Sequence, residues 1–195
     1  MAIETRPAVE VRQLLTPADV ERMLACGELD PDKIWELIDG ELVELPPSGF
    51  EHSDPEFNVL LALGIFAKRI GGKVSPSNIG FTVGANFQQL RSPDVSFFGP
   101  NRRIERDGAW GKGAADLAVE ILSANQYGEA YARTKVREYF AAGSQLVWLV
   151  HIRRKEVRVY RPGADEYAIM RGGAILTLEP IVAGFELRVA DIFEE

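Results

Sequence analysis

The stretch that decides the fold runs from Asp116 to Ser123 and reads Asp-Leu-Ala-Val-Glu-Ile-Leu-Ser. Side chains alternate between the two faces of an extended chain, so the apolar residues at positions 117, 119 and 121 share one face of the predicted strand. Glu120 lies on the other face, between two apolar residues. A carboxylate in such a place is costly to bury unless a cation or hydrogen-bond donors meet it, so the sequence predicts a partner for Glu120.

A helix and a second strand follow this strand along the chain. Between Glu129 and Ala142, apolar residues recur at steps of three and four, which is typical of an amphipathic helix that ends at Gly143. Residues 146–152 then read as a largely apolar strand. Strand, helix and strand make a crossover unit, which places Glu120 and the helix that carries Lys135 on one side of a sheet.

The rest of the chain is divided by helix caps, turns and short apolar runs. Thr16 and Pro17 match a helix start, and Asp-Gly at 39–40 between two apolar runs predicts a hairpin. Ser53 and Glu56 have capping-box spacing ahead of a long apolar segment. The predicted helices are 16–27, 57–70, 129–142 and 189–193. The predicted strands are 34–38, 42–45, a short one near 74, 79–83, 95–98, 117–122, 146–152, 157–160, 167–170 and 175–178. Residues 99–114 are predicted to form a loop.

The composition is that of one globular domain. The 195 residues are 46% hydrophobic, enough for a substantial core without disulfides, and residues 1–13 are expected to form a loosely ordered lead-in. The single Cys26 fits a reducing compartment. No apolar run approaches the roughly 20 residues that span a bilayer, and the first residues do not resemble a secretory signal. We therefore expect a cytoplasmic protein without a membrane anchor.

The net charge of −7 argues against broad, charge-driven coating of nucleic acid. It leaves room for a nuclease whose site is built from carboxylates and needs only a local basic rim. Two basic clusters could form that rim: Arg102, Arg103 and Arg106, and the group Arg153, Arg154, Lys155, Arg158 and Arg161. Because one acidic monomer presents little basic area, a homodimer that lines a groove would help to bind a DNA duplex.

Three ionisable residues in apolar surroundings are the candidate catalytic group: Asp94, Glu120 and Lys135. Two carboxylates on neighbouring strands form a hard, oxygen-rich site that suits Mg²⁺ or Mn²⁺. Lys135 could position an attacking water or stabilise charge on a phosphoryl group. Taken singly, each has an ordinary structural interpretation: Asp94 closes a turn after a proline, Glu120 forms a structural ion pair, and Lys135 faces solvent.

The chain resembles the Uma family of restriction endonucleases, a bacterial group in the PD-(D/E)XK nuclease superfamily. The likeness runs over most of its length, in the stretches Trp35–Leu42, Pro47–His52, Ser92–Val95, Val119–Ser123, Lys135–Tyr139 with Ala142-Gly143, Leu146–Val150 and Gly184–Phe193. The resemblance implies an α/β fold with a restriction-endonuclease-like (PD-(D/E)XK) core, in which helices flank a mixed central β-sheet and additional β-hairpins are attached.

The same resemblance implies roles for individual residues. Asp94 and Glu120 match the family's metal ligands. The usual signature has a lysine two residues after the acid, where this chain has Leu122, and Lys135 on the following helix matches the place from which related families supply it. His52 matches a histidine often seen in the family. Glu36, on the first hairpin, could add a third carboxylate or orient a water, or could be an exposed hairpin charge.

These observations lead to one main hypothesis and two alternatives. The main hypothesis is a Mg²⁺-dependent DNA endonuclease with Asp94 and Glu120 on the metal and Lys135 assisting the attacking water. The first alternative is a catalytically silent binding or assembly module in which the same three residues form a buried ion-paired network. The second is a metal-dependent hydrolase of another phosphate ester.

Overall fold

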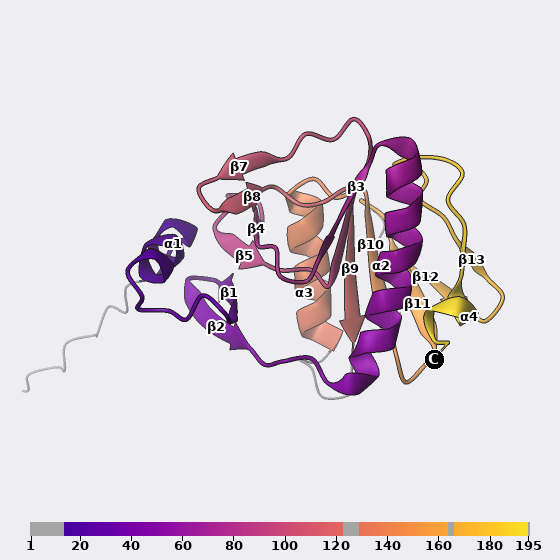
Figure 1. Cartoon of the computed structure of the whole chain (residues 1–195), viewed down its shortest axis with the longest axis horizontal. Helices are drawn as coiled ribbons and strands as arrows, with labels where there is room; N and C mark the ends of the chain where they lie inside the picture. Colours follow the sequence, from indigo (N-terminus) through magenta and orange to yellow (C-terminus); the bar gives the residue numbers. More distant parts are fainter. Residues whose placement is uncertain (1–13, 123–128, 164–165, 195) are drawn as a thin grey trace, which may run out of the picture.

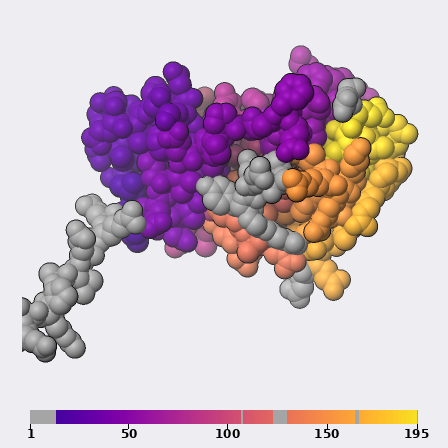
Figure 2. Space-filling view, turned by 90° about the horizontal axis from the view of Figure 1, so that it is seen from below, coloured from indigo at the N-terminus to yellow at the C-terminus, as the bar shows by residue number. Residues whose placement is uncertain are grey.

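The fold is built on two six-stranded sheets and a small two-stranded one. The computed structural model describes residues 14–122, 129–163 and 166–194, so the predicted lead-in at 1–13 lies outside the described residues. In Figure 1 the N-terminal elements lie at the left and the central sheet at the right. The space-filling view from below agrees, because the indigo N-terminal part lies beside the orange and yellow C-terminal part (Figure 2).

The central sheet has the strand order β12-β11-β10-β9-β6-β3. Its strands are β3 (Lys73–Pro76), β6 (Val95–Phe98), β9 (Leu117–Leu122), β10 (Leu146–His151), β11 (Glu156–Tyr160) and β12 (Ala168–Arg171). β9 and β10 are parallel and the other neighbours are antiparallel. The predicted mixed sheet is therefore confirmed, and so is the crossover from β9 to β10 through α3 (Glu129–Ala141).

Two helices flank this sheet on opposite faces (Figure 1). One face packs against α2 (Phe50–Ile70) through the odd-numbered residues of β9 and the side chains of Val59, Leu63 and Phe66. The other face packs against α3 through Ala118, Val147 and Leu149. The alternation of side chains along β9 thus places Glu120 on the α3 side, as the sequence predicts.

The N-terminal sheet has the order β2-β1-β5-β4-β8-β7. Its strands are β1 (Ile34–Ile38), β2 (Glu41–Leu45), β4 (Phe81–Val83), β5 (Gln89–Arg91), β7 (Glu105–Asp107) and β8 (Trp110–Lys112). At the β1–β2 turn, Asp39 and Gly40 both have positive φ, at 49° and 78°, the conformation that favours Asp-Gly in a tight hairpin. The predicted first hairpin is confirmed.

Two predictions about the N-terminal half are wrong. The predicted loop at 99–114 contains the β7–β8 hairpin, whose Asp107-Gly108 turn is the same signal that marks the first hairpin. Helix α2 begins at Phe50 with Gly49 as N-cap, and not after the predicted cap at Ser53. The Ser53 hydroxyl does not cap it, because Ser53 Oγ donates to the carbonyl of Phe50, 2.7 Å away, and Pro55 lies inside the helix. His52 therefore belongs to a helix and not to a loop.

The remaining elements are short and lie at the two ends of the chain. They are α1 (Pro17–Ala25), β13 (Ile175–Leu176), β14 (Leu187–Arg188) and α4 (Val189–Ile192). Thr16 caps α1 with its side chain, as predicted. α4 packs beside α2 in the same apolar cluster. None of the helices in the described part of the chain has the length and apolar character to cross a membrane.

Candidate active site

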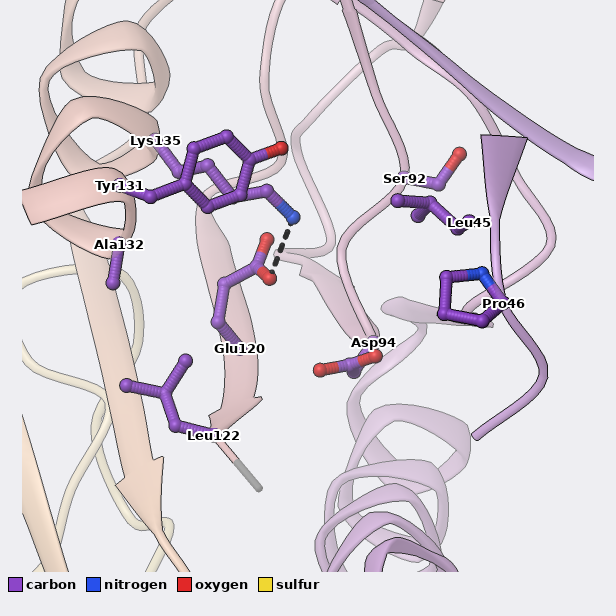
Figure 3. A pocket seen from close by; sticks show the side chains of 9 residues that line it. All are labelled: Leu45, Pro46, Ser92, Asp94, Glu120, Leu122, Tyr131, Ala132 and Lys135. Atoms are coloured by element: carbon purple, nitrogen blue, oxygen red, sulfur yellow. Dashed lines mark hydrogen bonds and ion pairs between the residues drawn. The ribbon is translucent and has the colours of Figure 1, made fainter. Parts of the chain in front are cut away.

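The site lies where the chain passes from one sheet to the other. Ser92, Pro93 and Asp94 connect β5 of the N-terminal sheet to β6 of the central sheet. β6 and β9 pair with Val95 opposite Val119, and continuing this register by one residue places Asp94 opposite Glu120. The carboxylate of Asp94 is anchored to β9, because its Oδ2 accepts a hydrogen bond of 2.6 Å from the amide of Ile121. Figure 3 shows both carboxylates at one pocket.

Lys135 reaches this point from α3. Its Nζ lies 2.9 Å from Glu120 Oε2 and 3.0 Å from Glu36 Oε1, and its residue is only 7% exposed. The other oxygen of Glu120 accepts a hydrogen bond of 2.5 Å from the hydroxyl of Tyr139, one turn further along α3. The structure therefore brings Asp94, Glu120 and Lys135 together, from the inter-sheet link, a strand and a helix. The sequence predicts this placement.

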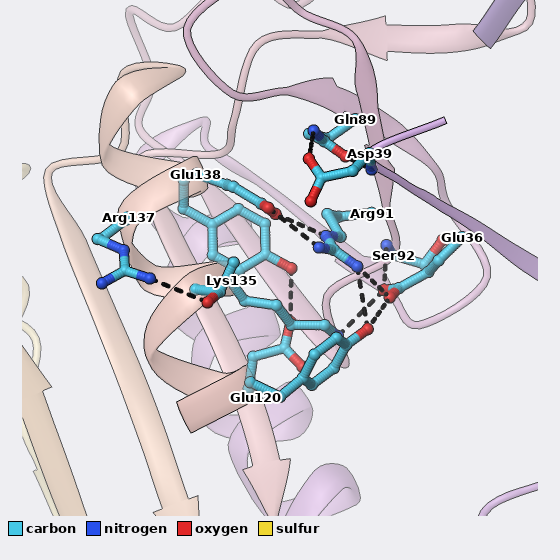
Figure 4. Close-up of polar contacts among 12 residues, drawn as sticks. Glu36, Asp39, Gln89, Arg91, Ser92, Glu120, Lys135, Arg137 and Glu138 are labelled. Atoms are coloured by element: carbon cyan, nitrogen blue, oxygen red, sulfur yellow. Dashed lines mark hydrogen bonds and ion pairs between the residues drawn. The ribbon is translucent and has the colours of Figure 1, made fainter. Parts of the chain in front are cut away.

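Glu36 connects Lys135 to a larger buried network (Figure 4). Its Oε2 accepts hydrogen bonds from Arg91 Nη1 at 2.9 Å and from the Tyr131 hydroxyl at 2.8 Å, and its Oε1 accepts one from the amide of Ser92 at 3.2 Å. The side chains of Glu36 and Arg91 are fully buried. Glu36 is thus no exposed hairpin charge, and it acts on the site through Lys135.

Arg91 is the residue of this network that the sequence did not single out. Its Nε and Nη2 donate to the two oxygens of Glu138, at 2.6 Å and 3.1 Å, while Nη1 binds Glu36. Arg91 belongs to β5, a strand in a polar segment that was not predicted either. A signal did exist for Tyr131 and Tyr139, because both are four residues from Lys135 and so share its side of the helix.

His52 supports Asp94 from α2. Its Nε2 lies 3.1 Å from the carbonyl oxygen of Ile121 and 3.4 Å from Asp94 Oδ2, and its Nδ1 lies 3.3 Å from Glu56 Oε2. Burial lowers the pKa of His52, but hydrogen bonds and charge from Asp94 and Glu56 outweigh burial and raise the pKa to about 10. The imidazolium therefore stabilises the carboxylate of Asp94 from α2.

Burial and the negative charges nearby disfavour the ionised form of Glu120. Burial raises the pKa of its carboxyl to about 7 against the attraction of Lys135, and the charges of Asp94 and Glu36 add to the rise. For Glu36, the attraction of Lys135 and Arg91 outweighs burial, so its pKa lies below the ordinary value. The pKa of Lys135 is raised, because its two carboxylate partners outweigh the desolvation of its ammonium group. Lys135 thus stays a cation, whereas the charged form of Glu120 is disfavoured.

The charges of the network do not balance. It contains the five carboxylates of Glu36, Glu56, Asp94, Glu120 and Glu138, and the three cations of His52, Arg91 and Lys135. Among the described residues, two negative charges remain when Glu120 is ionised and one remains when it is protonated. Since uncompensated charge is costly at a buried site, a further cation near the carboxylates would stabilise the arrangement.

A pocket opens beside the three predicted catalytic residues (Figure 3). It has a volume of about 60 Å³ and is lined by Leu45, Pro46, Ser92, Asp94, Glu120, Leu122, Tyr131, Ala132 and Lys135. The pocket can hold a small ion and water, because one water molecule needs a cavity volume of roughly 10–15 Å³. Leu122, two residues after Glu120, lines the pocket from β9, and Lys135 lines it from α3.

The donors fit Mg²⁺ or Mn²⁺ better than a softer metal. Within the described residues there is no group of three or more histidine, cysteine, aspartate or glutamate side chains arranged to hold a metal. Mg²⁺ does not require one, because it commonly keeps several waters and binds through one or two carboxylates together with the phosphates of the substrate. Asp94 and Glu120 are such a pair, and the excess negative charge around them suits a divalent cation.

The two basic clusters predicted as a rim are partly structural. Arg158 is buried and donates to the buried Glu156 at 3.1 Å, and Arg154 lies 3.7 Å from the same carboxylate. Arg102 donates to the carbonyl of Ala114 at 3.0 Å. These groups are therefore used in part to hold the fold, and the basic surface left for a ligand is smaller than the sequence indicates.

Comparison with known proteins gives a family and a shared fold. Residues 17–190 match the model of the family Uma2, described as "Putative restriction endonuclease". Among solved structures, the chain resembles a protein from Anabaena variabilis ATCC 29413 described as "a putative nuclease belonging to DUF820". The TM-score is 0.70 at 21% identity, over 82% of this chain and 89% of the other, which shows a shared fold. The curated proteins contain no match.

Proposed function

Because the chain belongs to the Uma2 family of restriction endonuclease-like proteins, we propose that it is a metal-dependent endonuclease that hydrolyses phosphodiester bonds of DNA. The observation that carries the proposal is the convergence of Asp94, Glu120 and Lys135 at one pocket, from the inter-sheet link, β9 and α3. Two acids and one amine are the groups that metal-assisted phosphodiester hydrolysis requires. Mg²⁺ or Mn²⁺ is the proposed cofactor.

Asp94 and Glu120 would hold the cation. When bound, it would polarise a phosphoryl oxygen and lower the pKa of a coordinated water. Asp94 keeps one oxygen on the amide of Ile121, which fixes the direction of its carboxylate. Glu120 would be available to the cation if Lys135 moved from its Oε2, and the raised pKa of Glu120 supports this, because the attraction of Lys135 does not offset burial.

Lys135 would act on the attacking water and on the phosphate. Glu36 holds the ammonium group of Lys135 at 3.0 Å, so Lys135 would keep a partner beside the pocket if Glu120 held the metal ion instead. Its raised pKa keeps it charged, so it serves as a hydrogen-bond donor and electrostatic stabiliser and not as a general base. Glu36 and the ring of Tyr131 would position Lys135, and Arg91 would support it by holding Glu36.

Cleavage of supercoiled plasmid DNA tests the proposal. We expect nicked or linear product with Mg²⁺ or Mn²⁺ and none with a chelator. Asp94→Asn should lower the rate at least about a hundredfold, because the amide keeps an acceptor for Ile121 but loses the charge that binds the metal. Asp32→Asn, which changes an exposed acid, is the matched control and should cleave normally.

RNA and small phosphodiesters in the same buffers decide the substrate class. Faster cleavage of either one than of DNA would contradict DNA as the substrate and favour the hydrolase of another phosphate ester. If none of these substrates is cleaved in the presence of the metal ions, the proposal of a nuclease is contradicted.

One observation favours a catalytically silent module as the second candidate. Both oxygens of Glu120 are occupied, by Lys135 and Tyr139, in a closed network that could serve stability alone. In that case each member should matter for folding and no phosphodiester should be cleaved. The two candidates differ in what substitution of Glu120 does to the melting temperature, since only the silent module needs that carboxylate for its fold.

A further inference from the structure

An apolar stripe runs along the outer side of α2. Phe50, Phe57, Leu61 and Ile65 are 89%, 59%, 47% and 64% exposed. Their spacings of seven, four and four residues place them on one side of the helix, opposite the buried side that carries His52 and Val59. With a rise of about 1.5 Å per residue, this α2 stripe is about 22 Å long. In Figure 1, α2 is visible over its whole length, and no other helix or strand lies in front of it.

Charges of opposite sign lie at the two ends of the α2 stripe. Glu51 and Asp54 lie in the first turns of the helix, and Lys68 and Arg69 lie in the last turn. Among the described residues, Glu51, Asp54 and Lys68 make no ion pair or side-chain hydrogen bond within the chain, while Arg69 stacks on Phe66. The surface is therefore acidic at one end, apolar in the middle and basic at the other end.

A groove adjoins the acidic end of the stripe. It has a volume of about 510 Å³ and is lined by Phe50, Glu51, Asp54, Pro55, Ile152, Lys155 and Phe193. Its walls combine aromatic and aliphatic side chains with the two acids of α2. An apolar side chain flanked by basic groups is the kind of segment that would fit it, and the basic end of α2, with Ile65 and Lys68, has that character.

We propose that the α2 stripe is the interface of a homodimer in which the α2 helices of two copies pack antiparallel across a two-fold axis. In a two-fold interface the same patch serves both copies, so it must be complementary to itself. An antiparallel arrangement meets this condition, because it sets apolar against apolar in the middle and the acidic first turn of each helix against the basic last turn of the other. A two-fold axis that crosses the stripe at the level of Val59 along the helix would place Phe57 against Leu61 of the second copy.

The size of the surface indicates how tightly the two copies are expected to bind. Stable interfaces bury roughly 800 Å² on each partner, which is more than four side chains supply, so the adjoining groove has to take part. The expected dimer is therefore one that forms at micromolar concentration and dissociates on dilution. The interface lies on the side of α2 away from His52 and Asp94, so dimerisation leaves the pocket open and does not depend on the proposed nuclease activity.

Sedimentation of the full chain over a micromolar concentration series tests the interface. The wild type should sediment as a dimer at the upper end, and Leu61→Glu/Ile65→Glu should sediment as a monomer, because it buries charge in the middle of the apolar stripe. Ile169→Glu is the matched control, since Ile169 is an equally exposed apolar residue on β12 and should leave the dimer intact. Unchanged melting temperatures would show that all variants fold.

A charge exchange tests the antiparallel orientation. Lys68→Glu sets like charges opposite each other at both symmetry-related ends of the interface and should raise the dissociation constant roughly tenfold, which is about 1.4 kcal/mol for the two contacts together. Adding Glu51→Lys to that variant should bring the constant back towards the wild-type value. A wild type that stays monomeric throughout, a dimer that survives Leu61→Glu/Ile65→Glu, or a charge exchange without recovery would each overturn the proposal.

Discussion

Replacing Glu120 by glutamine is expected to lower the rate of DNA cleavage at least about a thousandfold while leaving the fold nearly as stable as the wild type. Cleavage is lost because the neutral amide no longer attracts a divalent cation to Asp94. Stability is kept because Lys135 retains Glu36 as a partner at 3.0 Å, and the pKa of Glu120 shows that burial already disfavours its charge. The free energy of unfolding should change by no more than about 1 kcal/mol, the value of one hydrogen bond.

The measurement combines single-turnover cleavage with thermal unfolding of the same preparation. Glu44→Gln, on the exposed side of β2, is a suitable control because its carboxylate pairs with Lys33 at 2.8 Å on the surface and does not reach the pocket. The account fails if Glu120→Gln cleaves at the wild-type rate. A loss of several kcal/mol together with an inactive wild type would support the silent ion-paired module instead.

Replacing Arg91 by methionine is expected to destabilise the fold by about 3–5 kcal/mol. Arg91 is fully buried and binds two carboxylates from two different elements, Glu36 on β1 and Glu138 on α3. Methionine fills similar space but leaves Glu138 without its bidentate partner and Glu36 with less positive charge. At roughly 2–4 °C per kcal/mol for a chain of this size, the melting temperature should fall by roughly 6–20 °C.

Arg137→Met is the matched control for this substitution. Arg137 is an exposed arginine on α3 whose side chain donates to Thr134 Oγ at 3.0 Å, so its loss should change stability by less than about 0.5 kcal/mol. Denaturant unfolding of the two variants gives the comparison. Equal stability of Arg91→Met and Arg137→Met would mean that Arg91 is not paired in solution as it is in the structure.

The sequence predicted those parts of the site that depend on local pattern. The period of two in β9 placed Glu120 on the face opposite the odd-numbered core residues, and the period of three to four predicted the helix α3 that carries Lys135. The crossover rule then brought strand and helix to the same face of the sheet. These inferences hold because each rests on the geometry of a single element or of one connection.

The rest of the site depends on contacts between elements that are far apart in the sequence, which no local pattern encodes. Arg91 lies in a three-residue strand within polar sequence, and its partners are 55 and 47 residues away along the chain. The start of α2 was misjudged because Ser53 and Pro55 look like a cap and a first turn, whereas Gly49 begins the helix without a side-chain cap. That error hid the helical position from which His52 reaches Asp94.

The most direct test of the account is a crystal of the wild-type protein soaked with Mn²⁺, with data collected for the anomalous signal of manganese. The account predicts one peak in the pocket between the carboxylates of Asp94 and Glu120, with Lys135 moved off Glu120 and still bound to Glu36. No peak there, with Lys135 still bridging Glu120 and Glu36 at Mn²⁺ concentrations that support DNA cleavage, would contradict it.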